Sequence, residues 1–408
     1  MMEHINRYFR ILLVISLLLM ASSQNLKARS SDRITPLTRV SMLTASPGEE
    51  LYSVFGHSAL RVHDPVTMLD EVYNYGTFDF NTPNFYLKFT RGKLMYQLTV
   101  TTFETFLAEY HYEGRAVYEQ MLALEPGEVH SLYQFLQVNR MPENRDYLYD
   151  FFFDNCATRI RDVIDAHVEV EWDPDPFPGP PRSFRDMLQP YVAGTPWAAF
   201  GIDLALGLPA DEIADPWDYM FLPDEMFVAF AQARRADGRP LVESFLQVLP
   251  DAIVRGEPSP VTPARLMWIF FVLGVLSLFN QRVSKGFDMV YFSLLGLGGF
   301  VVFFLWFLSD HAATKNNLVL LWMLPTHLYF VFRAYSAGKS RKLAALYFKA
   351  VFVLNLALLF FWWILPQGFH PAFFPLILTA ALKASFIGFM PEGISGLRRF
   401  KPGLKPIK

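Results

Sequence analysis

Cysteine is almost absent from this chain of 408 residues, which contains a single one at position 156. One thiol cannot form an intramolecular disulfide, so a disulfide framework is excluded, and so is a zinc site built from several cysteines. The sequence also lacks a phosphate-binding P-loop, a glycine-rich dinucleotide fingerprint and an HExxH zinc motif. We therefore expect no cofactor and no metal centre.

An excess of charge of one sign is missing as well. Lys and Arg number 36 and Asp and Glu 39, which gives a formal net charge of −3. A nucleic-acid-binding protein normally carries a strongly basic surface, so we expect no nucleic acid partner. Apolar residues are abundant instead, at 52% of the chain, and the mean hydropathy is +0.21. This composition is too apolar for an ordinary soluble protein, and part of the chain must lie in lipid.

Residues 1–23 have the pattern of a signal peptide. Arg7 and Arg10 precede an apolar run over residues 11–20, and small residues follow at 21–23. The run is too short to span a bilayer comfortably. Basic residues followed by an apolar run and then by small residues are typical of secretory signals. An uncleaved anchor is the alternative, and it leaves the following segment on the same side of the membrane. No cysteine follows the run, so the chain is not itself a lipoprotein.

The C-terminal part, residues 264–392, contains apolar runs of spanning or near-spanning length. Lys and Arg concentrate in the first and third connections between the runs and in the tail, residues 393–408. The positive-inside rule places these segments in the cytoplasm and the preceding domain outside. The sequence therefore predicts an all-α bundle of about five transmembrane helices with a basic cytoplasmic tail. The five runs are 264–279, 287–308, 318–332, 343–365 and 373–390.

Between the signal peptide and the bundle, residues 30–260 mix strand and helix patterns and form a predicted exported domain. Residues 57–62 alternate with a period of two directly after a glycine, so a strand is expected to begin at His57. Residues 71–80 are rich in aromatics and predict a second strand that carries Asn74. Further elements are expected as a strand within 92–100 and as helices at 102–113, 128–139 and from 183 onward.

The single cysteine lies at the start of a predicted helix. An aromatic run ends at Asp154 and Asn155, both good N-cap residues, and apolar residues then recur at 157, 160 and 164. The positive end of a helix dipole lowers the pKa of a thiol and stabilises its thiolate. We therefore predict that Cys156 is a nucleophile. The alternative is a cysteine that only packs in a core.

A catalytic thiol needs a base and a polar group that orients the base. His57, at the start of a strand, and Asn74, on the next strand, are the candidates for these roles. Asn155, Ser58 and Tyr75 adjoin the catalytic candidates in the sequence and are the predicted substrate-binding residues of the exported domain. Four other histidines compete as the base but do not follow a glycine at a strand start, namely His63, His111, His130 and His167.

A polar pair, Asp310 and His311, ends the second membrane helix on the outer side. Such a pair could orient a lipid headgroup, and we count both residues among the substrate-binding candidates. The alternative is structural, because charged residues routinely end membrane helices at the interface.

A strand that begins Gly-His and a later helix that begins Asn-Cys resemble the circularly permuted NlpC/P60-like thiol enzymes, a superfamily that includes lecithin:retinol acyltransferase-type proteins. Four further motifs lie apart in the chain, at residues 46–62, 72–80, 88–94 and 153–162. Read together, they look like the Lnb family of Bacteroidota. The resemblance covers nearly the whole chain and implies an α+β fold, with a permuted papain-like periplasmic domain followed by a transmembrane bundle in the inner membrane. It also implies His57 and Cys156 as the catalytic pair. The role of Asn74 is not implied by the resemblance and is inferred only from the face of the strand on which this residue is expected to lie.

This resemblance implies a lipoprotein N-acyltransferase. Such an enzyme takes an acyl chain from a phospholipid as a cysteine thioester and passes it to the α-amine of a diacylglyceryl-cysteine lipoprotein. Phospholipid, diacylated lipoproteins and the membrane are then the partners. Two alternatives stay open. A membrane-tethered NlpC/P60-like cell-wall amidase predicts an open polar groove, and a non-catalytic lipoprotein-binding scaffold of the envelope predicts a buried, inert Cys156.

Overall fold

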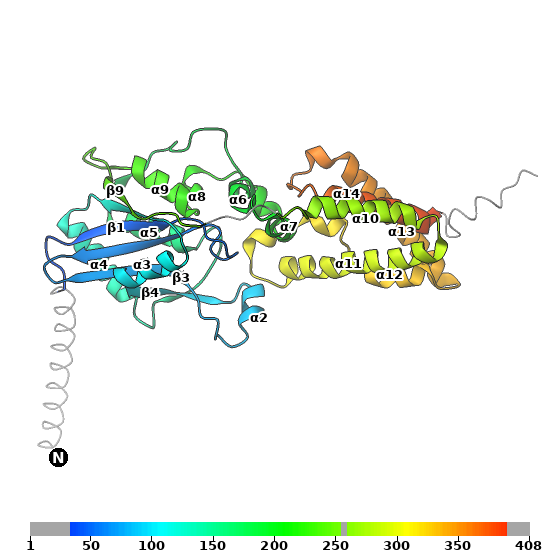
Figure 1. Cartoon of the computed structure of the whole chain (residues 1–408), viewed down its shortest axis with the longest axis horizontal. Coiled ribbons are helices and arrows are strands. Elements are labelled where there is room, and N and C mark those ends of the chain that lie inside the picture. Colours follow the sequence, from blue (N-terminus) through cyan, green and yellow to red (C-terminus); the bar gives the residue numbers. More distant parts are fainter. Residues whose placement is uncertain (1–32, 254–258, 390–408) are drawn as a thin grey trace, which may run out of the picture. The chain divides into compact units, whose positions relative to one another are not determined.

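The computed structural model describes residues 33–253 and 259–389 (Figure 1). The predicted signal peptide and the basic tail lie outside these residues. Backbone contacts divide the chain into two units. Unit 1 comprises Met1–Pro83, Leu94–Pro180 and Asp215–Val254, and unit 2 comprises Asn84–Lys93, Pro181–Ala214 and Arg255–Lys408. Two segments that we expected within the exported domain, 84–93 and 181–214, thus group with the membrane helices.

Unit 1 is built on a seven-stranded antiparallel sheet with the strand order β6-β4-β3-β2-β1-β5-β9 (Figure 1). The strand predicted to begin at His57 does begin there, and the predicted aromatic strand with Asn74 is its neighbour in the sheet. The strands are β1 (Arg39–Ala45), β2 (His57–Asp64), β3 (Leu69–Thr77), β4 (Met95–Thr102), β5 (Val117–Leu122), β6 (Asp146–Leu148) and β9 (Val242–Leu249).

Helices in unit 1 pack against this sheet through apolar side chains. Phe106 and Tyr110 of α3 join Leu43, Ala59 and Val72 of the sheet in one buried cluster. The helices predicted at 102–113, at 128–139 and at Cys156 are confirmed. The helices are α3 (Phe103–Tyr112), α4 (Pro126–Asn139), α5 (Cys156–His167), α8 (Pro216–Tyr219) and α9 (Pro223–Gln232), and a small second sheet pairs β7 (Val170–Glu171) with β8 (Arg234–Arg235).

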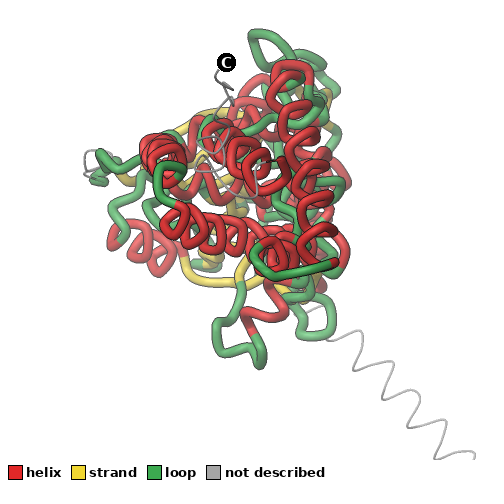
Figure 2. Tube along the Cα trace, turned by 90° about the vertical axis from the view of Figure 1, so that its right-hand side faces the viewer, coloured by secondary structure: helices red, strands yellow, loops and turns green. Residues whose placement is uncertain are grey.

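Unit 2 is helical (Figures 1 and 2). Among the described residues, α11 and α13 are long and apolar enough to cross a membrane, whereas α10 and α14 are shorter apolar helices. Its α-helices are α2 (Phe85–Thr90), α6 (Phe184–Val192), α7 (Pro196–Ala205), α10 (Pro263–Ser277), α11 (Gln281–Phe307), α12 (His327–Ala334), α13 (Lys339–Phe360) and α14 (Phe373–Phe389), and its 3-10 helices are η1 (Leu208–Asp211), η2 (Ala312–Thr314), η3 (Leu318–Leu321) and η4 (Trp362–Ile364).

The third apolar run, 318–332, does not form the single helix that we expected. It is divided into η3 and α12, with Pro325 between them. Proline has no N–H for the helical ladder and clashes with the preceding turn, which accounts for the break. The broken segment packs closely on α11, because a Cβ at Gly299 would lie only 1.8 Å from the carbonyl oxygen of Met323. Glycine is therefore required at this contact.

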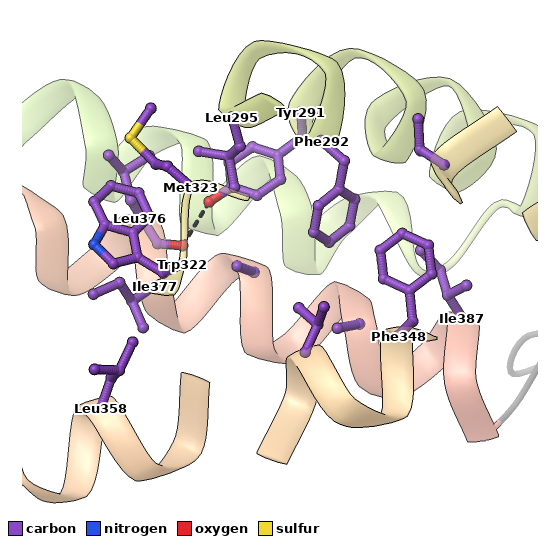
Figure 3. Packing of buried hydrophobic residues seen from close by; sticks show 14 of the residues in the cluster. Tyr291, Phe292, Leu295, Trp322, Met323, Phe348, Leu358, Leu376, Ile377 and Ile387 are labelled. Carbon is purple, nitrogen blue, oxygen red and sulfur yellow. Dashed lines mark hydrogen bonds between the residues drawn. The ribbon is translucent and has the colours of Figure 1, made fainter. Parts of the chain in front are cut away.

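A large aromatic core joins the helices of the bundle (Figure 3). Trp322 of the broken segment packs on Phe373 of α14, and Phe292 of α11 packs on Phe348 of α13. The hydroxyl of Tyr291 donates to the carbonyl oxygen of Leu376 at 2.5 Å, which is the dashed line in Figure 3. These contacts connect every long helix of the bundle except α10.

Buried polar contacts hold segment 181–214 to the rest of unit 2. The guanidinium of Arg185 lies 2.8 Å from Asp203 and 2.8 Å from Asp211, and all three side chains are largely buried. Asp211 also accepts from the backbone N–H of Gly368 at 2.8 Å. The amide of Asn317 donates to the backbone of α7. This network explains why the segment groups with the membrane helices.

A second buried network lies among α10, α11 and α14. The ammonium of Lys383 is 3.0 Å from Asp288 Oδ1 and donates to the hydroxyls of Ser277 and Ser284 at 2.8 and 2.7 Å. The hydroxyl of Tyr335 donates to the other carboxylate oxygen of Asp288. Lys383 and Asp288 are completely buried, so each charge depends on the other.

We predict that Lys383→Met destabilises the folded protein strongly, because it leaves Asp288 buried without its counter-charge. Removing one partner of a buried ion pair typically costs about 3–5 kcal/mol. The double variant Lys383→Met/Asp288→Leu should recover much of the loss, since no buried charge remains. Thermal unfolding of the detergent-solubilised chain, followed by circular dichroism, measures both effects.

The control is Lys342→Met, because Lys342 is exposed on α13. This change should leave the unfolding temperature unaltered. A single Lys383→Met variant as stable as the wild type, or a double variant no better than the single one, would show that the pair does not act as a unit.

Candidate active site

Helix α5 begins at Cys156 because Asn155 caps it. The side-chain oxygen of Asn155 accepts from the N–H groups of Ala157 and Thr158 at 2.8 and 3.0 Å. The hydroxyl of Thr158 accepts in return from the N–H of Asn155 at 2.8 Å, which completes a capping box. The predicted helix start is therefore confirmed, and it fixes the cysteine in the first turn.

Asn155 also fixes the surroundings of this helix start. Its side-chain NH₂ group donates to the carbonyl oxygens of Phe151 and Phe221 at 2.8 and 2.9 Å. The residue is buried, and both ends of its amide are used within unit 1. These hydrogen bonds give it a structural role in placing Cys156; its predicted substrate contact stays a prediction.

The thiol lies where the sheet opens. Pairing between β2 and β3 extends only from Leu60↔Tyr73 to Asp64↔Leu69, so Ser58 is beyond the last pair. The backbone N–H of Ser58 instead acts on the thiol of Cys156 and lowers its pKa, so this residue is close to the sulfur. On β3, Gly76 has a φ of +85°, and a Cβ built there would lie 3.4 Å from Cys156 Cβ. Glycine at this position lets the helix start approach the strand.

The predicted base and its orienting residue meet at the same opening. His57 Nε2 lies 3.4 Å from the side-chain oxygen of Asn74. His57 directly precedes Ser58, whose backbone N–H lowers the pKa of Cys156. The imidazole also stacks near Tyr110, with ring centroids 6.4 Å apart and an interplanar angle of 15°. The structure thus pairs His57 of β2 with Asn74 of β3, and the residues that adjoin Cys156, Ser58 and Gly76, follow them on the same two strands.

Burial shifts the pKa values of His57 and Cys156 in the directions that disfavour a thiolate–imidazolium ion pair. Burial lowers the pKa of His57 to about 4, the charge of Arg115 acts in the same direction, and the contact with Asn74 opposes the shift. Burial also raises the pKa of Cys156, against the effects of nearby N–H groups and of Arg115. The expectation that the helix terminus yields a thiolate is therefore wrong. The resting pair is a neutral thiol and a neutral imidazole.

Arg115 is a residue of this site that sequence reasoning missed. It is buried, and its Nε donates to the carbonyl oxygen of Ser46 at 2.7 Å, while Nη1 donates to Glu113 at 2.9 Å. Its guanidinium lies 4.7 Å over the ring of Tyr110, and Nη2 has no hydrogen-bond partner within the described residues. Arg115 supplies a fixed positive charge that favours the thiolate once it forms. Nothing in the sequence connects this arginine with position 156.

A row of aromatic rings, which we call the aromatic tract, leads from the thiol to the surface of unit 1. Its inner end is Tyr149. A Cβ built at Gly76 would lie 3.9 Å from the ring of Tyr149 and 3.4 Å from Cys156 Cβ, so both residues adjoin this glycine. The outer ends are exposed, at 63% for Tyr52 and 62% for Phe80. Successive ring contacts join Tyr149 to Tyr96 at 4.3 Å, Tyr96 to Phe78 at 5.2 Å, and Phe78 to Phe80 and Tyr52 at 5.0 and 6.4 Å.

Tyr149 brings a phenol into the surroundings of Cys156. Its hydroxyl has no hydrogen-bond partner within the part of the chain that the structure describes, and the residue is only partly buried. Burial and the nearby Cys156 raise the pKa of this phenol, so it stays protonated. It is therefore a hydrogen-bond donor beside the thiol, and sequence reasoning missed this role too.

The other predicted substrate-binding residues have different surroundings. The Ser58 hydroxyl is buried without a partner in the described residues, and the hydroxyl of Tyr75 donates to Asn139 at 2.6 Å. In unit 2, His311 Nε2 donates to the carbonyl oxygen of Phe89 at 2.9 Å, and Asp310 lies 3.6 Å from Lys93. Asp310 and His311 thus hold segment 84–93.

Among the described residues, no group of three His, Cys, Asp or Glu side chains could hold a metal ion.

Comparison with known families matches both halves of the chain. Residues 27–187 match the Lnb N-terminal periplasmic domain, and residues 255–390 match the Lnb transmembrane domain. The first match includes β1 to β4 and Cys156, and the second includes α10 to α14. No curated protein and no solved structure matches the chain. The chain is therefore a membrane protein with a periplasmic domain, and the candidate site lies in that domain.

The neutral resting pair leads to a prediction on the reactivity of Cys156. The rate of alkylation by iodoacetamide should rise about tenfold per pH unit between about pH 6 and 9, because the reactive thiolate is a minor species over this range. Arg115→Gln should slow alkylation at every pH, since losing the positive charge raises the pKa of the thiol further. Intact mass measures the rate directly, because the chain has only one cysteine.

Arg115→Lys keeps the charge and should lie between Arg115→Gln and the wild type. Arg239→Gln, at an exposed arginine, should not change the rate. A rate that is already at its plateau below pH 7 would show a thiolate–imidazolium pair and contradict the pKa directions given above.

Proposed function

The chain belongs to the Lnb family, and from this premise we propose that it is a lipoprotein N-acyltransferase of the bacterial inner membrane. It transfers an acyl chain from a phospholipid to the α-amine of a diacylglyceryl-cysteine lipoprotein, through a thioester on Cys156. The observation that carries this proposal is the aromatic tract, which gives the thiol an apolar approach of the kind that an acyl chain requires.

In the first step, Cys156 is the nucleophile and His57 the base. His57 is neutral at pH 7 and accepts the thiol proton while the sulfur attacks the ester carbonyl carbon of the phospholipid. The tetrahedral intermediate then expels the glycerol oxygen, which takes the proton from His57 and leaves as a lysophospholipid. Asn74 orients the imidazole through its side-chain oxygen. The products are an acyl-thioester enzyme and a lysophospholipid.

The negative oxygen of the tetrahedral intermediate needs hydrogen-bond donors. The Tyr149 hydroxyl and the backbone N–H of Cys156 are the candidates at this place, and one such donor is commonly worth about 3 kcal/mol of transition-state stabilisation. Arg115 adds a positive charge nearby, and burial of the site strengthens its effect.

In the second step, the lipoprotein α-amine attacks the thioester carbonyl. The amine reacts in its neutral form, and His57 accepts the proton that it loses. Collapse of the second intermediate breaks the C–S bond, and the sulfur recovers its proton from His57. The products are the N-acylated lipoprotein and the free thiol, so no cofactor is consumed.

The arrangement of unit 2 supports the proposed membrane topology. Segment 84–93 belongs to the matched periplasmic domain and contacts the C-terminal end of α11 through His311. That end of α11 then faces the periplasm, and the other end, with Arg282 and Lys285, faces the cytoplasm, as the positive-inside rule requires. With 27 residues, α11 is about 40 Å long, which exceeds the hydrocarbon thickness of a bilayer. We place the C-terminal tail in the cytoplasm.

The two alternatives fit the site less well. A cell-wall amidase would need an open polar groove for a peptide, whereas the surface beside the thiol is aromatic. A non-catalytic scaffold has no use for a partly exposed thiol next to a histidine, an asparagine and an unpaired phenol.

The central experiment expresses the wild type, Cys156→Ser and His57→Ala in cells that lack lipoprotein N-acylation. Mass spectrometry of the N-terminal peptide of a reporter lipoprotein should show a gain of one acyl chain with the wild type only. Thermal unfolding of the three purified proteins controls for folding. No gain with a folded wild type would reject acyl transfer and direct attention to peptidoglycan fragments.

A second experiment tests the role of Tyr149. Tyr149→Phe keeps the ring and its stacking on Tyr96 but removes the donor, so we expect the rate of acyl-enzyme formation to fall by roughly 10²-fold, as for other oxyanion donors. Tyr96→Phe is the matched control, because that phenol is in the same tract and Cys156 does not perturb it. Equal rates for Tyr149→Phe and wild type would remove the phenol from the mechanism.

A further inference from the structure

We propose that segment 84–93, which contains α2, inserts its apolar side chains into the periplasmic leaflet of the membrane and contacts lipid phosphates with its basic residues. The segment connects β3, which carries Asn74 and Gly76, to β4. This lipid-binding surface is independent of the acyl-transfer proposal, because it depends on contacts within unit 2 alone.

The apolar side chains of α2 have no protein core to pack in. The helix has no buried residue, and Tyr86, Leu87 and Phe89 are 78%, 56% and 49% exposed. Single exposed apolar residues are ordinary on protein surfaces. Three within four residues of one short helix form a patch that water disfavours, and such patches mark interaction surfaces.

Contacts with the end of α11 hold this short helix in place. Six residues are too few for a stable isolated helix. His311 Nε2 donates to the carbonyl oxygen of Phe89 at 2.9 Å, and the N–H of Asp310 donates to the carbonyl oxygen of Arg91 at 2.9 Å. Gly92, with a φ of +67°, allows the close approach, because a Cβ there would lie 3.2 Å from the N atom of His311. The patch is therefore presented at the end of a membrane-spanning helix.

The surface of α11 next to this contact indicates what covers the patch. Phe303, Phe307 and Leu308, near the periplasmic end of α11, are exposed in the protein. On a membrane-spanning helix, such side chains face lipid. The exposed side chains of α2 are held to this end of α11, so the patch continues a lipid-facing surface at the depth of the headgroups. Aromatic residues are the typical side chains at that depth.

The charges of the segment fit a lipid surface as well. Lys88 and Arg91 have no ion-pair or hydrogen-bond partner for their side chains within the described residues, and Lys93 lies 3.6 Å from Asp310. Basic side chains beside an apolar patch favour phosphate headgroups, and anionic lipids strengthen the attraction. A soluble protein partner would not explain why the patch is attached to a transmembrane helix.

Site-directed spin labelling of the full-length chain tests this proposal. Cys156→Ser removes the only cysteine, and Tyr86→Cys or Leu87→Cys then gives one labelling site in each protein. The labelled proteins are reconstituted in nanodiscs of phosphatidylethanolamine and phosphatidylglycerol, without lipoprotein. Collision rates of the nitroxide with oxygen, which concentrates in the bilayer, and with a water-soluble nickel chelate report its depth.

We expect the labels at 86 and 87 to collide several-fold more with oxygen than with the chelate, relative to a control at Val66→Cys. Val66 is exposed in the β2–β3 turn, at the other end of β3 from the connection to α2. Changing Lys88 and Arg91 to Glu should reduce the oxygen preference at position 86. Nanodiscs of phosphatidylcholine alone should reduce it less, because they keep the phosphates and the apolar interior.

Labels at 86 and 87 that behave like the label at 66 would overturn the proposal. Labels that lie in water until a diacylated lipopeptide is added would overturn it too, and would assign the patch to the lipoprotein. A loss of N-acylation has no bearing on these measurements, since the labelled chains already lack the catalytic thiol.

Discussion

The start of α5 is the constraint on which the candidate site depends. Four hydrogen bonds from the side chain of Asn155 connect the helix start, the preceding turn and the segment before α9. The helix can approach the sheet because β2 and β3 separate beyond Leu60 and Tyr73, and because Gly76 has no side chain. A change at any of these points would move the sulfur of Cys156 relative to His57 and Asn74.

The close packing that positions the thiol also opposes its ionisation. Burial raises the pKa of Cys156 and lowers that of His57, so both start uncharged. For a lipid substrate this is an advantage, because an acyl chain removes water from the site in any case, and a neutral pair has less solvation to lose. In the acyl transfer that we propose, the proton moves only when the carbonyl carbon is in place. The same proposal assigns stabilisation of the charge that forms to Arg115, the Tyr149 phenol and backbone N–H groups.

Local patterns in the sequence predicted the parts of the site that are local in the chain. Gly56 and His57 marked the start of β2, and Asn155 marked the start of α5, since turn and cap residues act on their own neighbours. Arg115 and Tyr149 were missed because only tertiary contacts bring them to the site. Arg115 follows α3 and lies over its Tyr110, and Tyr149 follows β6, which pairs with β4. The direction of the thiol pKa shift was missed for the same reason. Desolvation, which raises this pKa, depends on how the folded chain packs around the thiol, whereas the helix dipole, which lowers it, can be predicted from the local sequence.

Long-range contacts also decide which segments belong together, and this limits how the protein can be divided. The chain passes from one unit to the other after Pro83, Lys93, Pro180, Ala214 and Val254. A fragment spanning 30–260 would contain segments 84–93 and 181–214 without the partners that hold them, namely His311 for the first and Gly368 and Asn317 for the second. It would expose Phe200 and Leu204 of α7, which pack against the core of the bundle, and invite aggregation. Inactivity of such a fragment would therefore say nothing about its chemistry, and the full chain is the unit in which function must be measured.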